Sequence, residues 1–196
     1  MPPFDPARAA SYPAVIGCDE VGRGALSGPV MVAAVWFDPA AIPGSLLGAL
    51  DDSKKLPESV RDRLAPLIRA HGRVALAAGS PALIDRINIR AATLDAMGRA
   101  VAKLGIAAPV YVDGRDALPG LPGRAVIGGE RQVPQIAAAS IVAKVLRDAY
   151  MRRLARRHPG YGWERNVGYG TELHRAGLAT LGRSPHHRVS FTKSFG

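Results

Sequence analysis

The sequence Ile16-Gly17-Cys18-Asp19-Glu20-Val21-Gly22-Arg23-Gly24-Ala25-Leu26-Ser27-Gly28-Pro29-Val30 places two adjacent carboxylates at the end of an apolar run. A glycine-rich turn with one arginine follows, and a second apolar run extends from Val30 to Phe37. Valine and isoleucine favour strands, whereas glycine and proline favour turns. We therefore expect a hairpin-like pair of strands, with the acidic pair at the exit of the first.

Asp19 and Glu20 indicate a site for a divalent cation. Adjacent carboxylates repel each other, and a hard cation such as Mg²⁺ reverses that cost because it prefers oxygen ligands. Successive strand residues point to opposite faces, so both residues reach one ion only if the backbone bends at Glu20 or one contributes its main-chain carbonyl. Gly22 and Gly24 allow a bend and a close ligand, and Arg23 is a forked donor suited to phosphate. A solvated acidic turn is the alternative.

Length and composition bound the class of protein. The 196 residues suffice for one domain with a hydrophobic core and a small C-terminal appendage. The single cysteine, Cys18, excludes an internal disulfide framework, and we expect it to be buried in the first strand. No run is long and apolar enough to span a membrane, and residues 1–12 lack the pattern of a secretory signal. These features indicate a cytoplasmic protein.

The formal charge of +10 indicates a polyanionic partner, because neutralisation of phosphates supplies most of the affinity for nucleic acids. A general bias toward basic composition is the alternative, since Ala, Gly, Pro and Arg are abundant. Against such a background, an acidic cluster indicates a specific site.

Periodicity and turn residues divide the rest of the chain into alternating helices and strands. The expected helices cover about 58–70, 89–104 and 135–157, with a short one from Pro81 and another ending near Leu181. The expected strands cover 73–78, 109–112 and 125–127.

Two further aspartates stand at positions that these elements make informative. Asp113 ends a short apolar run before a glycine, and ligands gather where strands end, although an ordinary Asp-Gly turn is the alternative. Asp148 shares a helical stripe with Ile141, where an unpaired carboxylate is costly. Either a cation or Lys144, one turn earlier, compensates it, and the pattern leaves both open.

Two other segments have the composition of phosphate- or base-binding sites. Ser53, Lys54 and Lys55 precede a predicted helix N-terminus, where anions bind well, although solvated lysines explain the stretch equally. Residues 161–171 set Tyr161 and Tyr169 among glycines and cations, a pattern used for stacking on sugars and bases.

Taken in order, these motifs resemble those of the bacterial type II ribonuclease H (ribonuclease HII) family. The matching blocks are Asp19 to Gly24 with Gly28-Pro29-Val30, Asp52-Ser53-Lys54-Lys55-Leu56, Val112-Asp113-Gly114, residues 136–148, Gly168-Tyr169-Gly170-Thr171, and His187-Arg188 with Ser190-Phe191. They follow the family's order over nearly the whole chain, so the set is far more specific than a lone Gly-Arg-Gly.

The resemblance implies an α/β RNase H-like fold, with a mixed central sheet flanked by helices. It implies a catalytic domain over residues 1–160 and a small helical C-terminal extension over 161–196 that contributes to substrate binding. The implied activity is hydrolysis of the RNA strand of RNA/DNA hybrids and nicking on the 5′ side of ribonucleotides embedded in duplex DNA, leaving 5′-phosphate and 3′-hydroxyl. The implied cofactors are Mg²⁺ or Mn²⁺, in a two-metal site when substrate is bound, and nothing suggests more than a monomer.

The resemblance also implies roles for individual residues. Asp19, Glu20 and Asp113 would be the core metal ligands, and Asp148 would complete the catalytic set at the second ion. The segment Gly22, Arg23 and Gly24 would hold the ribonucleotide 2′-hydroxyl, mainly through its backbone.

Other implied contacts concern the rest of the substrate. Tyr169 would stack on the sugar of the following deoxynucleotide and so read the RNA-to-DNA junction. The candidate phosphate contacts are Ser53, Lys54, Lys144, Arg188 and Ser190. The chain departs from the family pattern at Val167, where lysine is common, and at Glu130, where aspartate is usual.

Other classes of protein explain fewer of these features. An RNase H-fold DNA nuclease such as a junction resolvase also uses clustered carboxylates and a basic surface, and it stays the alternative. A non-catalytic nucleic-acid-binding protein leaves four aligned carboxylates unexplained. The spacing of Gly22, Gly24 and Gly28 differs from the dinucleotide-binding fingerprint, and no P-loop lysine follows.

Overall fold

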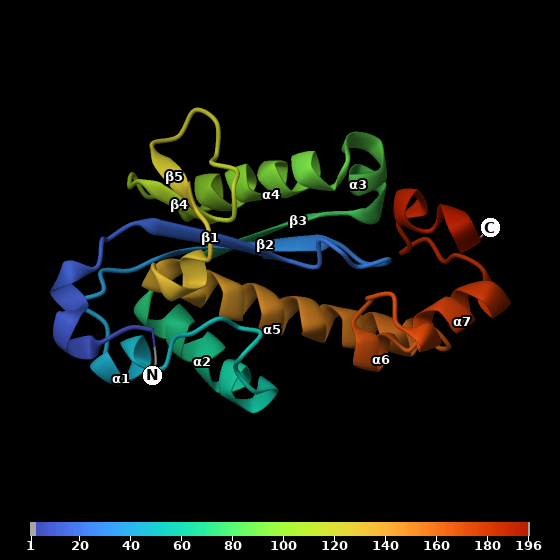
Figure 1. Cartoon of the computed structure of the whole chain (residues 1–196), viewed down its shortest axis with the longest axis horizontal. Helices are drawn as coiled ribbons and strands as arrows, with labels where there is room; N and C mark the ends of the chain where they lie inside the picture. Colours follow the sequence, from blue (N-terminus) through green and yellow to red (C-terminus); the bar gives the residue numbers. More distant parts are fainter. Residues whose placement is uncertain (1–2, 196) are drawn as a thin grey trace.

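The centre of the computed structural model, which describes residues 3–195, is a five-stranded mixed sheet in the order β3-β2-β1-β4-β5 (Figure 1). Strand β1 pairs antiparallel with β2 and parallel with β4, while β3 and β5 form the edges. The strands are β1 (Ile16–Val21), β2 (Val30–Trp36), β3 (Arg73–Gly79), β4 (Val110–Asp113) and β5 (Gly123–Val126).

Helices cover both faces of this sheet, which confirms the predicted α/β class (Figure 1). Helix α4 packs on one face, α5 packs on the other, and α2 lies outside α5. The α-helices are α1 (Gly44–Leu47), α2 (Glu58–His71), α3 (Pro81–Ile87), α4 (Ile89–Leu104), α5 (Pro134–Arg157), α6 (Trp163–Asn166) and α7 (Glu172–Leu181). Short 3₁₀ helices are η1 (Pro6–Ser11), η2 (Gly129–Arg131), η3 (Val189–Phe191) and η4 (Lys193–Phe195). The long elements match the predicted ranges closely, whereas α1 lies outside the predicted helices.

Alternation along β1 sends its side chains to two different layers. Ile16 and Cys18 are fully buried in the cluster beneath α4, which confirms the burial expected for the cysteine. Asp19, one residue further, therefore faces α5. Because the parallel register pairs Cys18 with Val112, the next residues, Asp19 and Asp113, leave the sheet side by side.

Helix α5 contacts β1 at unusually short range, and this contact requires a glycine. A Cβ atom at Gly17 would lie 2.2 Å from the carbonyl carbon of Gln135 and 2.4 Å from the backbone nitrogen of Ile136. The side-chain amide of Gln135 donates to the carbonyls of Pro13 and Phe37 at 2.9 Å each, which fixes the start of α5 at the edge of the strands. The close approach brings the middle of α5 next to the end of β1.

Residues beyond α5 fold back against its end (Figure 1). Helix α6 packs on α5, and the following segment returns to the loop after β1, where Ser27 and His187 form an isolated β-bridge. The boundary between a catalytic domain and an extension at residue 160 stays a prediction. Within residues 3–195, no helix combines the length and apolarity that crossing a membrane requires.

Replacing Gly17 with alanine is expected to destabilise the protein, because the added methyl group meets backbone atoms that cannot rotate away. Overpacking of this kind costs about 1–3 kcal/mol or more. Gly98→Ala on α4 is the matched control, since its added Cβ meets no atom within 4 Å. Urea unfolding of both variants measures the difference, and equal unfolding free energies for the two variants would contradict the proposed role of the α5–β1 contact.

Candidate active site

Three carboxylates gather on the α5 side of the sheet: Asp19 in β1, two residues before its end, Asp113 at the end of β4, and Glu130 in η2. Burial raises the pKa of Asp19 well above its usual range, and the neighbouring Glu20 raises it further. Asp113 and Glu130 act on Asp19 in the same direction, while a hydrogen bond from the Ser140 hydroxyl opposes them. The raised pKa reflects negative charge that the protein itself leaves uncompensated.

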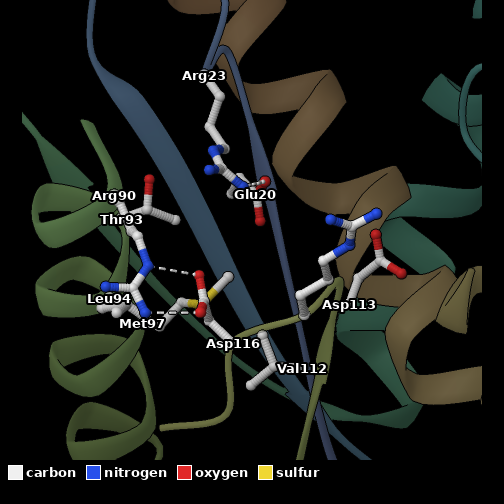
Figure 2. A pocket seen from close by; sticks show the side chains of 10 residues that line it. Glu20, Arg23, Arg90, Thr93, Leu94, Met97, Val112, Asp113 and Asp116 are labelled. Carbon is white, nitrogen blue, oxygen red and sulfur yellow. Dashed lines mark hydrogen bonds and ion pairs between the residues drawn. The ribbon is translucent and has the colours of Figure 1, made fainter. Parts of the chain in front are cut away.

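Glu20 lies on the opposite face of β1, because the strand continues in regular register to Val21. Its carboxylate accepts a hydrogen bond from the exposed Arg23 at 3.4 Å, as Figure 2 shows. The bend considered for Glu20 is therefore absent, and its main-chain carbonyl is the route by which it can face the same ion as Asp19. Consistent with this divergence, no three Asp, Glu, His or Cys side chains in the described part of the chain stand close enough to share an ion.

Asp19 lies beside a pair of hydroxyl groups from two other segments. Ser53 and Ser140 are both buried, and their hydroxyl oxygens lie 2.8 Å apart. The Ser140 hydroxyl also lowers the pKa of Asp19, against the larger effect of burial. Ser53, predicted as a phosphate contact, thus points inward, toward Ser140. Lys54, its exposed neighbour, lies 3.8 Å from Glu130.

Asp113 and Glu130 are joined through the start of η2. The Asp113 carboxylate accepts a hydrogen bond from the backbone N–H of Gly129 at 2.8 Å. Burial raises the pKa of Glu130, and Asp113 raises it further. Glu130 was noted in the sequence only as a departure from the family's aspartate, yet the structure sets it among the acidic residues. The family's aspartate at this position was the sequence signal that could have identified Glu130 as a site residue.

Asp148 is the predicted site residue that the structure separates from the others. It lies eight residues after Ser140 on α5, about 12 Å along the helix axis. Its carboxylate pairs with Lys144 at 2.9 Å, so the second of the two partners considered from the sequence is the one present. Lys144, predicted as a phosphate contact, is thereby engaged by Asp148.

The Gly22-Arg23-Gly24 turn is held from below by Arg188, which has no exposed surface. The guanidinium of Arg188 donates to the carbonyls of Gly22 at 2.6 Å, Arg23 at 2.7 Å and Gly28 at 3.0 Å. This geometry gives Arg188 a positioning role rather than the predicted contact with phosphate. Burial and, to a lesser extent, the nearby Arg147 together lower its pKa to about 9.

Arg147 is a second buried arginine that grips the same loop from α5. It donates to the carbonyls of Pro29 at 3.0 Å, Ser27 at 3.2 Å and Val167 at 2.8 Å. A Cβ atom at Gly22, where φ is +89°, would lie 2.1 Å from its Nε atom. Arg147 therefore locks the loop after β1 to the segment that precedes Tyr169.

Tyr169 stands over this arginine and rests on a buried histidine pair. Its ring centroid is 5.6 Å from the guanidinium carbon of Arg147. Its carbonyl lies 3.0 Å from Nδ1 of His174, whose Nε2 lies 3.0 Å from both Trp163 Nε1 and His187 Nε2. The half-buried Tyr169 ring is thus fixed from both its side-chain and its backbone end.

Ser190, the last predicted phosphate contact, anchors the C-terminal segment. Its hydroxyl donates to Asp85 of α3, and the backbone N–H groups of Val189 and Ser190 donate to the same carboxylate at 2.9 Å. Residues 189–191 are thereby tied to the α4 side of the molecule.

Comparisons with known proteins agree with this arrangement. A sequence profile of the family described as Ribonuclease HII matches residues 16–194. The Ribonuclease HII of Rhodospirillum rubrum is 56% identical, over 90% of this chain and 83% of that protein. The chain belongs to the ribonuclease HII family. It is accordingly a ribonuclease H, a hydrolase that acts on RNA in RNA/DNA hybrids, in a family that depends on divalent metal ions.

Other relatives extend the agreement to structure. The Ribonuclease HII of Paramagnetospirillum magneticum is 54% identical, over 90% of this chain and 89% of that protein. The RNase HII in a PCNA complex from Archaeoglobus fulgidus superimposes with a TM-score of 0.76, at 28% identity, over 91% of this chain and 93% of that chain. A ribonuclease H2 from Pyrococcus horikoshii, 22% identical, shares the fold with a TM-score of 0.76 over 93% of this chain and 97% of that chain.

Replacing Arg188 with methionine is expected to lower the unfolding free energy by about 3 kcal/mol, because buried carbonyls lose their donors. Cleavage should fall more than stability alone explains, since the Gly-Arg-Gly turn loses its support. Arg183→Met is the control, because Arg183 is exposed and makes a single bond of 3.5 Å to the Thr192 carbonyl. Urea unfolding and a cleavage assay at a temperature where both variants are folded give the comparison. Equal behaviour of the two variants would refute the positioning role.

Proposed function

We propose that this ribonuclease H nicks duplex DNA on the 5′ side of an embedded ribonucleotide, and cuts the RNA strand of hybrids, by two-metal-ion catalysis. The products are a 5′-phosphate and a 3′-hydroxyl. The observation that carries the proposal is the cluster of Asp19, Asp113 and Glu130 beside a Gly-Arg-Gly turn that two buried arginines hold in place. Bound divalent cations supply activation of the attacking water and stabilisation of the leaving 3′-oxygen.

The chain's own residues provide the metal-binding groups. Their carboxylate oxygens are the donors that Mg²⁺ and Mn²⁺ prefer, and the raised pKa values of Asp19 and Glu130 fit a site that awaits positive charge. Divided between two ions, so that no ion is held by all three side chains, the carboxylates of Asp19, Asp113 and Glu130 would be ligands, and Glu20 would contribute its main-chain carbonyl. Glu130 takes the place that the sequence suggested for Asp148.

Recognition of the ribonucleotide falls to the turn and to Tyr169. The 2′-hydroxyl is the local difference between RNA and DNA, so a rigid backbone pocket at Gly22, Arg23 and Gly24 discriminates by hydrogen bonding. A Cβ at Gly24 would meet no atom within 4 Å, which leaves its backbone open to a ligand. Tyr169 stacks on the following deoxynucleotide. The exposed side chain of Lys54 binds a phosphate. We expect the enzyme to act as a monomer.

The first test uses a DNA duplex with one ribonucleotide, labelled at the 5′ end, with Mg²⁺ or Mn²⁺. A single metal-dependent nick 5′ to the ribonucleotide is expected, with no cut in an all-DNA duplex or with the Asp113→Asn variant. Glu130→Gln should reduce cleavage far more than Asp148→Asn. The reverse ranking would return Asp148 to the metal site, and cleavage of the all-DNA duplex would favour a DNA nuclease.

Replacing Tyr169 with alanine is expected to reduce nicking at a single embedded ribonucleotide more than cleavage of a long hybrid, because only the former contains the junction. Loss of base or sugar stacking costs about 1–3 kcal/mol, which corresponds to roughly 5–150-fold in rate. Cleavage rates on the two substrates, measured with the same enzyme preparation, give the ratio. A uniform loss on both substrates would remove the junction-reading role.

A further inference from the structure

A basic hollow lies against the C-terminal half of α5, away from the acidic cluster. Its volume is about 450 Å³, and its lining contains no carboxylate. The lining residues are Tyr150, Arg153, Leu154, Arg157, His158 and His186.

The two arginines of this hollow have the character of binding residues rather than of structural ones. Arg153 and Arg157 are one helical turn apart and both exposed, and within residues 3–195 neither forms an ion pair. Their neighbour Arg152, by contrast, is paired with Glu58 at 2.6 Å. Two unpaired guanidinium groups on one stripe are free to bind phosphate oxygens.

Two histidines also line the hollow, and one of them is hydrogen-bonded to the loop after β1. The rings of His158 and His186 are 4.8 Å apart in an edge-to-face arrangement. The carbonyl of His186 accepts a hydrogen bond of 2.8 Å from the backbone N–H of Gly28. Arg188, two residues later, holds the Gly-Arg-Gly turn, so the hollow and the turn keep a fixed relative position.

Helix α5 is continuous from Pro134 to Arg157 and runs from the sheet toward α6 (Figure 1). Positions along it therefore give the axial order of the acidic cluster, Tyr169 and the hollow. Ser140 lies beside Asp19, Arg147 lies beneath Tyr169, and Arg153 follows. Arg153 is thirteen residues beyond Ser140, which places it about 20 Å along the helix. At about 3.4 Å per nucleotide along one strand, this distance corresponds to about six nucleotides.

We propose that this hollow binds the phosphodiester backbone of the substrate duplex about six nucleotides to the 3′ side of the cut. The 3′ direction rests on the proposed function, in which Tyr169 contacts the nucleotide that follows the ribonucleotide. Arg153 and Arg157 bind the phosphate oxygens, and His158 and His186 line the same hollow. Tyr150 and Leu154 supply an apolar floor for the sugar.

A second basic hollow provides a matched control. Arg69, Arg73 and Lys103 line it at the opposite end of the sheet, where Arg73 pairs with Trp36 and Trp36 with Ile16. A duplex seated at Asp19 and continuing past Tyr169 runs away from that end. The control is the double variant Arg69→Ala and Arg73→Ala. It removes two positive charges, as the double variant Arg153→Ala and Arg157→Ala does, but it leaves the proposed path of the duplex intact.

The experiment measures binding by fluorescence anisotropy in EDTA, which prevents cleavage. The duplexes carry one ribonucleotide and extend either three or twelve base pairs to its 3′ side. Each lost phosphate contact should lower the slope of log Kd against log salt by about one. For the Arg153/Arg157 double variant, we expect this slope to fall by about two on the long-arm duplex and to stay unchanged on the short-arm duplex. The Arg69/Arg73 double variant should match wild type on both.

An unchanged slope for the Arg153/Arg157 variant, or an equal change for the Arg69/Arg73 variant, overturns the proposal. So does an equal loss on both arm lengths, because the contact would then lie elsewhere. Failure of the proposed function is a separate result, namely the absence of a metal-dependent nick by wild type. In that case the slope on a long all-DNA duplex still decides whether the hollow binds a phosphodiester backbone.

Discussion

The arrangement of the site depends on the burial of two positive charges that have no acidic partner. Arg147 and Arg188 are both inaccessible to solvent, and in the described part of the chain neither forms an ion pair with a carboxylate. Burying a charge is costly unless its hydrogen bonds are satisfied, so the six backbone carbonyls around these guanidinium groups are obligatory partners. Those carbonyls come from the loop after β1 and from the segment before Tyr169. If either segment moved, a buried guanidinium group would be left without its hydrogen-bond acceptors.

The acidic residues present the opposite situation, in which negative charges stand close together with little compensation. Asp19 is buried, lies beside the Ser53–Ser140 pair and is repelled by its neighbours. The cost is tolerable because the surrounding frame is strong: α5 lies on β1 with no side chain between them at Gly17. Clusters of this kind mark functional sites, since a purely structural core has no reason to collect like charges.

Much of this could be predicted from the sequence, and the failures have physical causes. Helical periodicity located the long helices, whereas short apolar runs located the strands, and Asp19 and Asp113 follow such runs in β1 and β4. Helical periodicity also placed Asp148 on the packing face of α5, but it does not tell a metal from Lys144 as the partner. Glu130 joins the cluster through a 3₁₀ turn that has no periodicity. The family resemblance implied that Arg188 contacts phosphate, and its bonds to backbone carbonyls leave no sequence pattern from which a positioning role could be predicted.

The histidine pair beneath Tyr169 has a fixed arrangement of protons. The backbone N–H of Ser184 lies 3.0 Å from Nδ1 of His187, and because it only donates, the proton of that ring must sit on Nε2. His187 and Trp163 then both donate to Nε2 of His174, which in turn donates from Nδ1 to the carbonyl of Tyr169. Burial and, to a lesser extent, the nearby His174 together lower the pKa of His187 to about 4. Burial lowers the pKa of His174 as well, so both imidazoles are neutral at neutral pH and the backbone of Tyr169 rests on a pair of rings whose protons have fixed positions.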